Sequence, residues 1–391
     1  MTRNVQKERN HIDIACFLAV LTLMVLSLGV VYSASSTWAL DRLGESGKLL
    51  GSHAIKVLLG FVAIFAFMQM DYHRFRRLTK PALVAAVALL LVTLALGGRF
   101  KGATRWLLVG GFGLQPADFA KFALVFHLAV LVEAKGEALA DFKKGFLPML
   151  VWIGAVSVLV LAQPNFSMGA MIFGISLVML FLGRARMPHI ALTLAALIPL
   201  LVGFMLIAPY RMQRILSYIG RGNGEASASA RHQLTQAIIG FGNGGLFGLG
   251  PGGSHQRDHF LPESYGDFVF AIVGEEYGLL GTIFFVLLFL VIFLRGMKIA
   301  RHAPDELGRM LALGITCTIT LYALVNACVT LGILPTTGLP MPFVSYGGSA
   351  MLFSCAAVGV LLNISTQTDL HPRLATGGVR TLRPAGAAGR A

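Results

Sequence analysis

Charged residues are scarce in this chain of 391 residues. Only 13% of them are Asp, Glu, Lys or Arg, against roughly 25% in an ordinary soluble domain, whereas 56% are hydrophobic. This balance excludes a soluble globular enzyme. The net charge of +14 does not by itself indicate nucleic acid, because the basic residues lie between long apolar segments. We therefore expect membrane lipids as partners and no nucleic acid.

Cysteine is also scarce. The four cysteines, Cys16, Cys317, Cys328 and Cys355, all fall inside apolar runs, so they predict neither a disulfide framework nor a zinc site. We interpret them as small core residues. No repeat of 20 to 50 residues is visible, and the two halves do not share the paired broken helices of many inverted-repeat transporters.

Ten apolar segments dominate the sequence. A helix that crosses the ~30 Å hydrocarbon core needs about 20 largely apolar residues, since lipid offers no partner for free backbone groups. The segments lie near residues 14–32, 53–70, 81–96, 119–132, 146–162, 166–182, 190–208, 277–294, 310–331 and 348–362. The first is too long for a signal peptide, and we interpret it as an uncleaved span. The sequence predicts an all-α polytopic membrane protein with ten transmembrane helices.

Basic residues alternate between the two sides of these spans. They gather on the side of the N-terminus, in segments 74–80, 135–144, 184–186, 295–309 and 373–390. Cytoplasmic loops retain Lys and Arg, so both termini are predicted to be cytoplasmic. The chain then forms one transmembrane domain, residues 1–366, with a large extracytoplasmic loop at about 209–267 between spans seven and eight. Residues 367–391, rich in Gly, Ala, Pro and Arg, predict a disordered tail.

The loop at 209–267 is long enough to have a function. Apolar residues at helical spacing predict that it is folded, namely Ile215, Leu216, Ile238, Ile239 and Phe241. Its glycines match the dinucleotide fingerprint G-x-G-x-x-G at 240–245 and again at 248–253. That fingerprint needs a βαβ unit, which is missing. We interpret these glycines as tight turns that let backbone approach backbone.

Asp267 lies between this loop and the apolar run that begins at Phe268. A carboxylate at the rim of the membrane is partly desolvated, which raises its pKa toward the range that a general base for a sugar hydroxyl needs. The alternative is a helix N-terminal cap, a position that also favours Asp. Composition alone leaves both interpretations open.

Other ionisable residues lie at the ends of spans, where they are costly and therefore suggest function. Arg105 precedes a predicted helix start, and Asp118 and Lys121 lie three residues apart on one face of that helix. The last two can equally form a structural ion pair with each other. Glu275 and Glu276 either cap a helix or neutralise a neighbouring charge, and we class them with Asp118 as structural, paired charges.

Several short motifs resemble one family when they are taken together. They are Tyr-Ser-Ala-Ser-Ser at 32–36, Arg-Trp at 105–106, Gln-Pro at 115–116 and again at 163–164, Tyr-Arg at 210–211, Leu-Pro-Glu at 261–263, Asp-Phe at 267–268, Gly-Glu-Glu at 274–276, Asn326, Leu-Pro-Thr-Thr-Gly at 334–338, and Pro-Phe-Val-Ser-Tyr-Gly-Gly-Ser at 342–349. From residue 14 to 365 the chain resembles the SEDS proteins (shape, elongation, division and sporulation), and most closely their FtsW branch.

The resemblance implies a peptidoglycan glycosyltransferase that polymerises lipid II beside a class B penicillin-binding protein. Asp267 matches the family's essential carboxylate and would act as the general base. Arg105, Lys121, Arg211 and Arg214 would neutralise the undecaprenyl pyrophosphate leaving group. The family also implies a divalent cation, Mg²⁺ or Mn²⁺, but no ligand cluster in the sequence identifies its site. No organic cofactor is expected.

Four further polar residues complete the candidate substrate-binding set. They are Gln233, Gln236, Glu263 and Ser345. Three positions depart from the family pattern, which usually has Glu at Asp118, His-Thr at residues 265–266 and often Asp at Asn165. The change at 265–266 puts in doubt any role borrowed for the neighbours of Asp267, and Asn165 argues against a catalytic residue at that position.

Three other functions use the same residues. A lipid II flippase would bind the pyrophosphate along a path with Arg105, Asp118 and Lys121. A scaffold without catalysis would tolerate loss of Asp267. A RodA-type polymerase would act in elongation, but the motifs at 33–36 and 334–338 look more like the division branch. We therefore expect an enzyme of the bacterial inner membrane at the division septum, with other divisome proteins as partners.

Overall fold

The computed structural model describes residues 10–96, 98–100, 103–109, 112–207, 216, 218, 225–262 and 264–370. A helix covers each of the ten predicted apolar segments. These helices are α1 (Ile14–Leu43), α2 (Lys48–Gln69), α3 (Phe75–Leu96), α4 (Pro116–Lys135), α5 (Leu147–Ala162), α6 (Phe166–Leu182), α7 (Met187–Ile207), α10 (Val269–Arg301), α11 (Glu306–Thr330) and α12 (Gly348–Ser365). A further helix, α9 (Glu225–Gly244), lies in the predicted loop.

The helices differ in how well they suit a membrane. Among the described residues, seven helical segments are long and apolar enough to cross one, and they contain α1, α2, α3, α5, α10, α11 and α12. The apolar parts of α6 and α7 are shorter. Helix α4 carries Asp118, Lys121 and Glu133. Length and composition therefore identify a multi-pass membrane protein.

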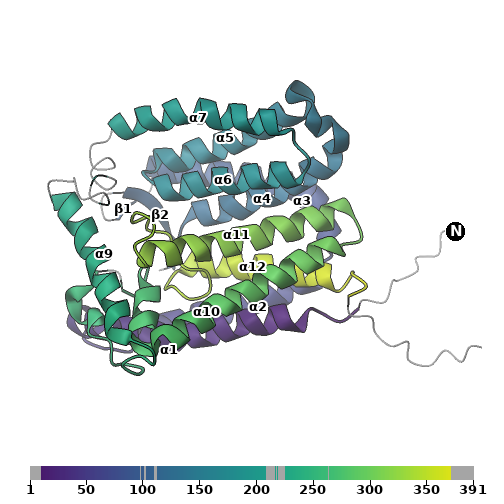
Figure 1. Cartoon of the computed structure of the whole chain (residues 1–391). Helices are drawn as coiled ribbons and strands as arrows, with labels where there is room; N and C mark the ends of the chain where they lie inside the picture. Colours follow the sequence, from purple (N-terminus) through teal and green to yellow (C-terminus); the bar gives the residue numbers. More distant parts are fainter. Residues whose placement is uncertain are drawn as a thin grey trace, which may run out of the picture.

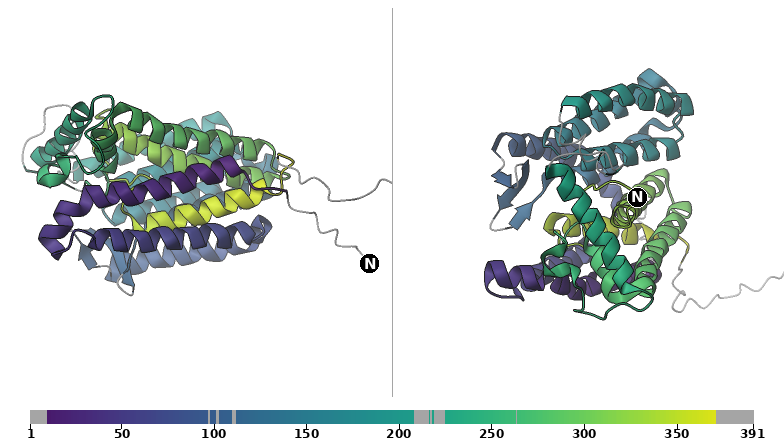
Figure 2. Two further views of the ribbon diagram at one scale, coloured as in Figure 1. Left: turned by 90° about the horizontal axis from the view of Figure 1, so that it is seen from below. Right: turned by 60° about the vertical axis from the view of Figure 1, so that its left-hand side comes forward.

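The long helices run side by side in one bundle (Figure 1). We call the end that carries α9 and the strands the loop end, and the opposite end the terminal end. In Figure 2, right, α9 crosses the loop end. At the terminal end the amide of Asn10 donates to the carbonyl of Thr366 at 2.8 Å. The first described residues and the end of α12 therefore meet on the same side of the bundle.

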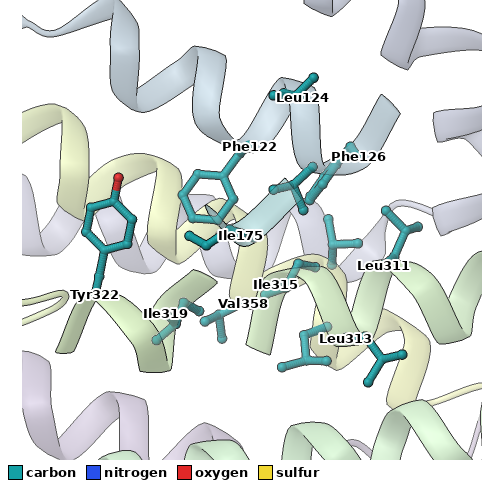
Figure 3. Close-up of a cluster of buried hydrophobic side chains, with 14 of the residues drawn as sticks. Phe122, Leu124, Phe126, Ile175, Leu311, Leu313, Ile315, Ile319, Tyr322 and Val358 are labelled. Carbon is teal, nitrogen blue, oxygen red and sulfur yellow. The ribbon is translucent and has the colours of Figure 1, made fainter. Parts of the chain in front are cut away.

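The core lies between α4, α6, α11 and α12. Figure 3 shows Phe122 of α4, Ile175 of α6 and Ile315 of α11 among its buried side chains. Gly314 lets these helices approach closely, because a Cβ there would lie 2.7 Å from a methyl group of Val125. Since lipid tails are as apolar as the core, small residues and close packing hold such helices together.

The prediction of an all-α chain is wrong at residues 98–114. Three short antiparallel strands form there, β1 (Gly98–Phe100), β2 (Ala103–Val109) and β3 (Phe112–Leu114), in the order β1-β2-β3. The cause is visible in the sequence, where Trp106, Leu107, Leu108 and Val109 favour a strand and a Gly-Gly pair follows, as in many hairpins.

At the loop end, two helices extend more than two turns beyond their predicted ends. Helix α1 continues from the predicted end at residue 32 to Leu43. Helix α10 begins at Val269, eight residues before the predicted span, and contains a break at Gly278, whose φ of 63° is not helical. Both extensions point toward the loop end, where the extra turns contact the predicted loop rather than lipid.

The predicted loop is folded in its described part. Helix α9 packs against α10, and Phe241 contacts the ring of Phe270 with centroids 5.8 Å apart. The other predicted anchors differ, since Ile238 and Ile239 of α9 are 49% and 42% exposed. Residues 208–215 lie outside the described residues, as do residues 371–391 of the predicted tail, whereas residues 367–370 form turns at the terminal end.

Candidate active site

Asp267 lies at the loop end, one residue before the N-cap of α10, which is Phe268. The side-chain amide of Asn326 in α11 donates both to the carbonyl of Asp267, at 2.8 Å, and to the carbonyl of Leu339, at 2.7 Å. The Asp267 carboxylate also lies against Gly338, where a Cβ would be 3.2 Å from Oδ2. Asn326 therefore fixes the backbone of Asp267, and the segment before α12 lies against its carboxylate.

Three aromatic side chains, Trp38, Tyr265 and Tyr346, pack together, with Tyr265 two residues before Asp267, and we call them the aromatic wall. Tyr265 contacts Trp38 of α1 and Tyr346, with ring centroids 5.5 Å and 5.8 Å apart. The amide of Tyr346 donates to the carbonyl of Tyr265 at 2.9 Å. Burial raises the pKa of the Tyr265 phenol above its ordinary value. The wall ties the segment before α12 to the segment before α10.

The extension of α1 beyond residue 32 contacts the loop that precedes Asp267. Ser264 donates from its hydroxyl to the carbonyl of Ala34 at 2.8 Å, and Thr37 donates to Asp258 at 2.7 Å. The Ser33 hydroxyl donates to the buried carboxylate of Glu276. The Tyr-Ser-Ala-Ser-Ser motif thus supplies hydroxyl groups and little bulk where the loop packs.

Glu275 and Glu276 are buried and hold the glycine-rich segment to α10. Asn243 and the amide of Gln256 each donate to Glu275 at 3.1 Å, and the Ser254 hydroxyl donates to the same carboxylate. The two residues are only 0% and 1% exposed, and hydrogen bonds from the loop to Glu275 and from α1 to Glu276 offset part of the cost of burying these polar groups. Losing either carboxylate would free the loop that precedes Asp267.

Glycines let the loop backbone reach the break in α10. The amides of Leu249 and Gly250 donate to the carbonyls of Glu275 and Glu276, both at 3.0 Å. A Cβ at Gly248 would lie 2.1 Å from the Glu276 carbonyl oxygen. The prediction that these glycines allow close backbone approach is confirmed, and the described structure around them is a turn against a helix, not a nucleotide fold.

A second polar group is buried between α4, α11 and α12. Lys121 forms an ion pair with Asp118 at 3.4 Å, and both side chains are about 5% exposed. Ser349 donates to the other oxygen of Asp118 at 2.8 Å, and the Lys121 ammonium lies 4.2 Å from the Tyr322 ring centroid. The two charges compensate each other inside the bundle, and Ser349 lies three residues after Tyr346 of the aromatic wall.

Arg105 lies on β2 and donates to the carbonyl of Pro164, in the turn between α5 and α6. Next to it, the side-chain amide of the buried Gln163 donates to the carbonyl of Leu90 in α3 at 2.9 Å. The strand therefore brings a guanidinium to the mouth of the bundle at its loop end.

The remaining predicted residues are distributed differently. Gln233 and Gln236 are partly buried on α9. Ser345 is only 3% exposed, and its hydroxyl accepts a hydrogen bond from the amide of Met341 at 2.8 Å. Arg211, Arg214 and Glu263 lie outside the described residues. The structure thus joins Asp118 with Lys121, and Asp267 with the segment before α12.

One cation at this end was missed by the sequence analysis. Lys56 of α2 places its ammonium 3.5 Å from the Tyr346 ring centroid. A signal was present, since Lys56 is a lone charge in the predicted span 53–70, and such charges suggest function. Trp38 was missed for another reason, because the predicted first span ended before it.

No group of three or more His, Cys, Asp or Glu side chains is placed to hold a metal ion within the described part of the chain. A Mg²⁺ ion is often held by one or two carboxylates together with the phosphates of a substrate. Asp267 could supply one such carboxylate. The described residues therefore do not form a complete metal site of their own.

Fold and site together define a class: a multi-pass helical membrane protein that carries Asp267, Arg105 and Lys56 at the loop end of its bundle. Comparisons with known proteins agree. The chain matches the family model described as "Cell cycle protein", which covers FtsW, RodA and SpoVE, over residues 14–370. It belongs to this family, the SEDS family.

Relatives and solved structures are similar over nearly the whole chain. The probable peptidoglycan glycosyltransferase FtsW of Geobacter metallireducens is 36% identical and covers 94% of this chain and 98% of its own. The stage V sporulation protein E of Bacillus subtilis is also 36% identical, covering 89% and 96%.

Two solved structures share the fold. A chain of a peptidoglycan synthase complex that coordinates polymerization and crosslinking has a TM-score of 0.75 at 24% identity, with 91% of this chain and 98% of that chain covered. The rod shape determining protein RodA of Thermus thermophilus has a TM-score of 0.68 at 23% identity, covering 92% and 98%.

Proposed function

We propose that this chain is a peptidoglycan glycosyltransferase that polymerises lipid II into glycan strands during septal cell-wall synthesis. A relative that carries the name of this activity is 36% identical over 368 residues, and other relatives are named FtsW or stage V sporulation protein E. The observation that carries the proposal is the position of Asp267, a carboxylate whose backbone is fixed by Asn326 at the mouth of a membrane bundle.

Asp267 would act as the general base. It would take the proton from the 4-hydroxyl of the acceptor N-acetylglucosamine, whose oxygen then attacks the anomeric carbon of the lipid-linked donor. A glycosidic bond forms as the bond to the pyrophosphate breaks, and undecaprenyl pyrophosphate leaves. Fixing the backbone of Asp267 beforehand reduces the reorganisation that the transition state requires.

Cations would stabilise the leaving pyrophosphate. Arg105 is held at the loop end by the Pro164 carbonyl, and Lys121 lies deeper in the bundle. Arg211 and Arg214 remain candidates from the sequence, as do Gln233, Gln236, Glu263 and Ser345 for contacts to the substrate. A Mg²⁺ or Mn²⁺ ion is part of the proposal, held by Asp267 and by phosphate oxygens of the substrate, where it would offset negative charge.

The proposed topology has ten spans, both termini in the cytoplasm and the loop end outside the bacterial inner membrane. The contact between Asn10 and Thr366 supports an even number of crossings. The loops at the terminal end carry most of the Lys and Arg residues, which supports a cytoplasmic location. Lipid-linked precursors would then reach Asp267 from the outer leaflet.

The proposed partner is a class B penicillin-binding protein that cross-links the glycan product, together with other divisome proteins. A structural neighbour in a complex that coordinates polymerization and crosslinking supports this assignment. The relatives named FtsW support a role in division rather than elongation. In such a complex, polymerisation by this chain would be coupled to cross-linking by the partner, so that new glycan strands are cross-linked as they form.

The test is polymerisation of lipid II by the purified protein with its cognate transpeptidase, comparing wild type with Asp267→Asn. Loss of a general base typically costs 10²- to 10⁴-fold, so we expect at least a hundredfold loss of glycan strands. Thermal unfolding and co-purification with the partner should be unchanged, since Asn326 contacts the backbone carbonyl of Asp267 and not its carboxylate.

Other outcomes identify other functions. Full polymerisation by Asp267→Asn would contradict the assignment of the base. If the wild type is inactive while lipid II crosses the membrane of proteoliposomes, the chain is a transporter. If it does neither but still holds the transpeptidase, it is a scaffold.

A further inference from the structure

The geometry points to Lys56 as a binding residue for a phosphate group of the lipid-linked substrate, at a position between Asp267 and the Asp118–Lys121 pair. This inference rests on the proposed function, because it takes the pyrophosphate of the donor as the anion. Neither the motifs nor the comparisons assign a role to this lysine.

The position of Lys56 is costly. It lies in α2, one of the seven helical segments apolar enough to cross a membrane, and its neighbours Ile55, Leu58 and Leu59 are exposed to the surroundings of the bundle. A lysine within such a helix is unfavourable unless it is paired or serves a function. Its side chain turns inward instead, toward Tyr346.

No carboxylate in the described part of the chain forms an ion pair with Lys56. Its neighbour one turn earlier, His53, is buried, and the Nε2 atom of His53 is hydrogen-bonded to the Ser27 hydroxyl at 2.9 Å. The Tyr346 ring, 3.5 Å from the ammonium, offers a weak attraction and leaves the donor hydrogens available. Among the residues that the structure describes, no carboxylate therefore compensates this positive charge.

The surroundings of Lys56 link it to both polar groups of the site. Tyr346 is bonded through its backbone to Tyr265, two residues before Asp267. Gly348 lies on the other side, and a Cβ there would be 3.4 Å from Cε of Lys56. One residue further, Ser349 donates to Asp118. The lysine thus lies against the segment that joins the proposed base to the buried ion pair.

A phosphate is the anion that fits this arrangement. Lysine binds phosphate as a compact point charge with several donors, and such charge-assisted bonds are about twice as strong as neutral ones. The first turn of α12 starts beside Lys56 and adds a partial positive charge. A phosphate beside Lys56 could belong to the lipid-linked substrate or to a phospholipid headgroup. We assign it to the lipid-linked substrate.

The first experiment measures polymerisation kinetics with lipid II in neutral nanodiscs. Lys56→Met should raise the KM for lipid II about tenfold or more, because a charge-assisted hydrogen bond is lost. Lys56→Arg should stay within about threefold of wild type. Lys48→Met is the matched control, since Lys48 lies on the exposed first turn of the same helix and should change nothing.

The second experiment does not require turnover. Equilibrium binding of undecaprenyl pyrophosphate to the purified protein should weaken about tenfold in Lys56→Met, whereas undecaprenol, which lacks phosphate, should bind equally to both. Thermal unfolding of each variant identifies one that fails to fold; if Lys56→Met does, Lys56→Gln, which also removes the charge, takes its place and Lys56→Arg remains the conservative control. An inactive wild type would contradict the proposed function and leave this binding test intact.

Three outcomes would overturn the inference. The first is an unchanged KM and unchanged pyrophosphate binding in a folded Lys56→Met, which would make the lysine a packing residue against Tyr346. The second is equal weakening of undecaprenol binding. The third is a variant that changes only the dependence of activity on added phosphatidylglycerol, which would identify a phospholipid headgroup as the anion.

Discussion

At the scale of single residues, the buried ion pair of Asp118 and Lys121 could serve either substrate binding or the stability of the fold. Removing one partner of such a pair leaves an uncompensated charge and typically costs 3 to 5 kcal/mol, whereas replacing both by neutral residues of similar shape is often tolerated. Ser349 and Tyr322 add contacts that suit a purely structural pair. A substrate role for Lys121 therefore has to be separated from its role in folding.

We expect Lys121→Met to lower stability by about 3 kcal/mol and to abolish polymerisation. The double variant Asp118→Asn/Lys121→Met should regain most of the stability, while polymerisation stays at least tenfold below wild type. The measurements are the thermal midpoint in detergent and the rate of lipid II polymerisation. If activity returns together with stability, Lys121 is structural and leaves the set of substrate-binding residues.

The chemistry of the site was only partly accessible from the sequence. Asp267 and the Asp118–Lys121 spacing could be identified because a charge beside an apolar run is visible in one dimension. The contact of Lys56 with Tyr346 could not, since α2 and the segment before α12 are nearly three hundred residues apart. Nor does a sequence show that the Ser345 hydroxyl is occupied by the amide of Met341.

At the scale of elements, the glycine-rich segment is joined to the break in α10 by backbone contacts. Gly248 has a φ of +83° and no room for a Cβ, whereas Gly250 has a φ of +90° and open space around it. Gly242 has neither constraint, since nothing lies within 4 Å of its Cβ position. Substituting these three glycines therefore distinguishes two stability costs of a side chain, that of a left-handed backbone conformation and that of a clash with neighbouring backbone.

Alanine substitutions should therefore show a graded effect. Gly242→Ala should be neutral or slightly stabilising, because alanine favours the helix. Gly250→Ala should cost about 1 to 2 kcal/mol, since a left-handed conformation is unfavourable for alanine. Gly248→Ala should cost more, displace the loop and reduce polymerisation strongly. Limited proteolysis and the thermal midpoint report the order, and equal effects of the substitutions at 248 and 250 would contradict a role for close approach.

Most elements were predictable because each apolar segment must form its hydrogen bonds internally in lipid. A helix is present at each of the ten predicted segments. The failures lie where that constraint ends. Strands β1 to β3 and the last eleven residues of α1 are stabilised by contacts with the turn between α5 and α6 or with the loop, as the hydrogen bonds of Arg105 and Ser264 show. Such contacts follow from tertiary structure.

At the scale of the whole molecule, the number of crossings decides which groups face the substrate. Three helices differ from the seven that are long and apolar enough to cross a membrane: α4 carries charge, and the apolar parts of α6 and α7 are short. A charged α4 is compatible with a crossing because Asp118 and Lys121 pair inside the bundle. The topology is best tested with cysteines on either side of these helices.

We expect Glu137→Cys and Arg186→Cys, both exposed at the terminal end, to react with a membrane-impermeant maleimide only after the membrane is permeabilised. Leu246→Cys, which is 60% exposed at the loop end, should react in intact spheroplasts. The native Cys16 and Cys355 are buried, so background labelling falls mainly to the partly exposed Cys317 and Cys328, and a variant lacking these two is the parent for the series. Among the described helices that precede the loop, α7 alone separates residues 186 and 246. If both residues react only after permeabilisation, α7 does not cross the membrane, and Asp267 would then face the cytoplasm, where the proposed acceptor strand is absent.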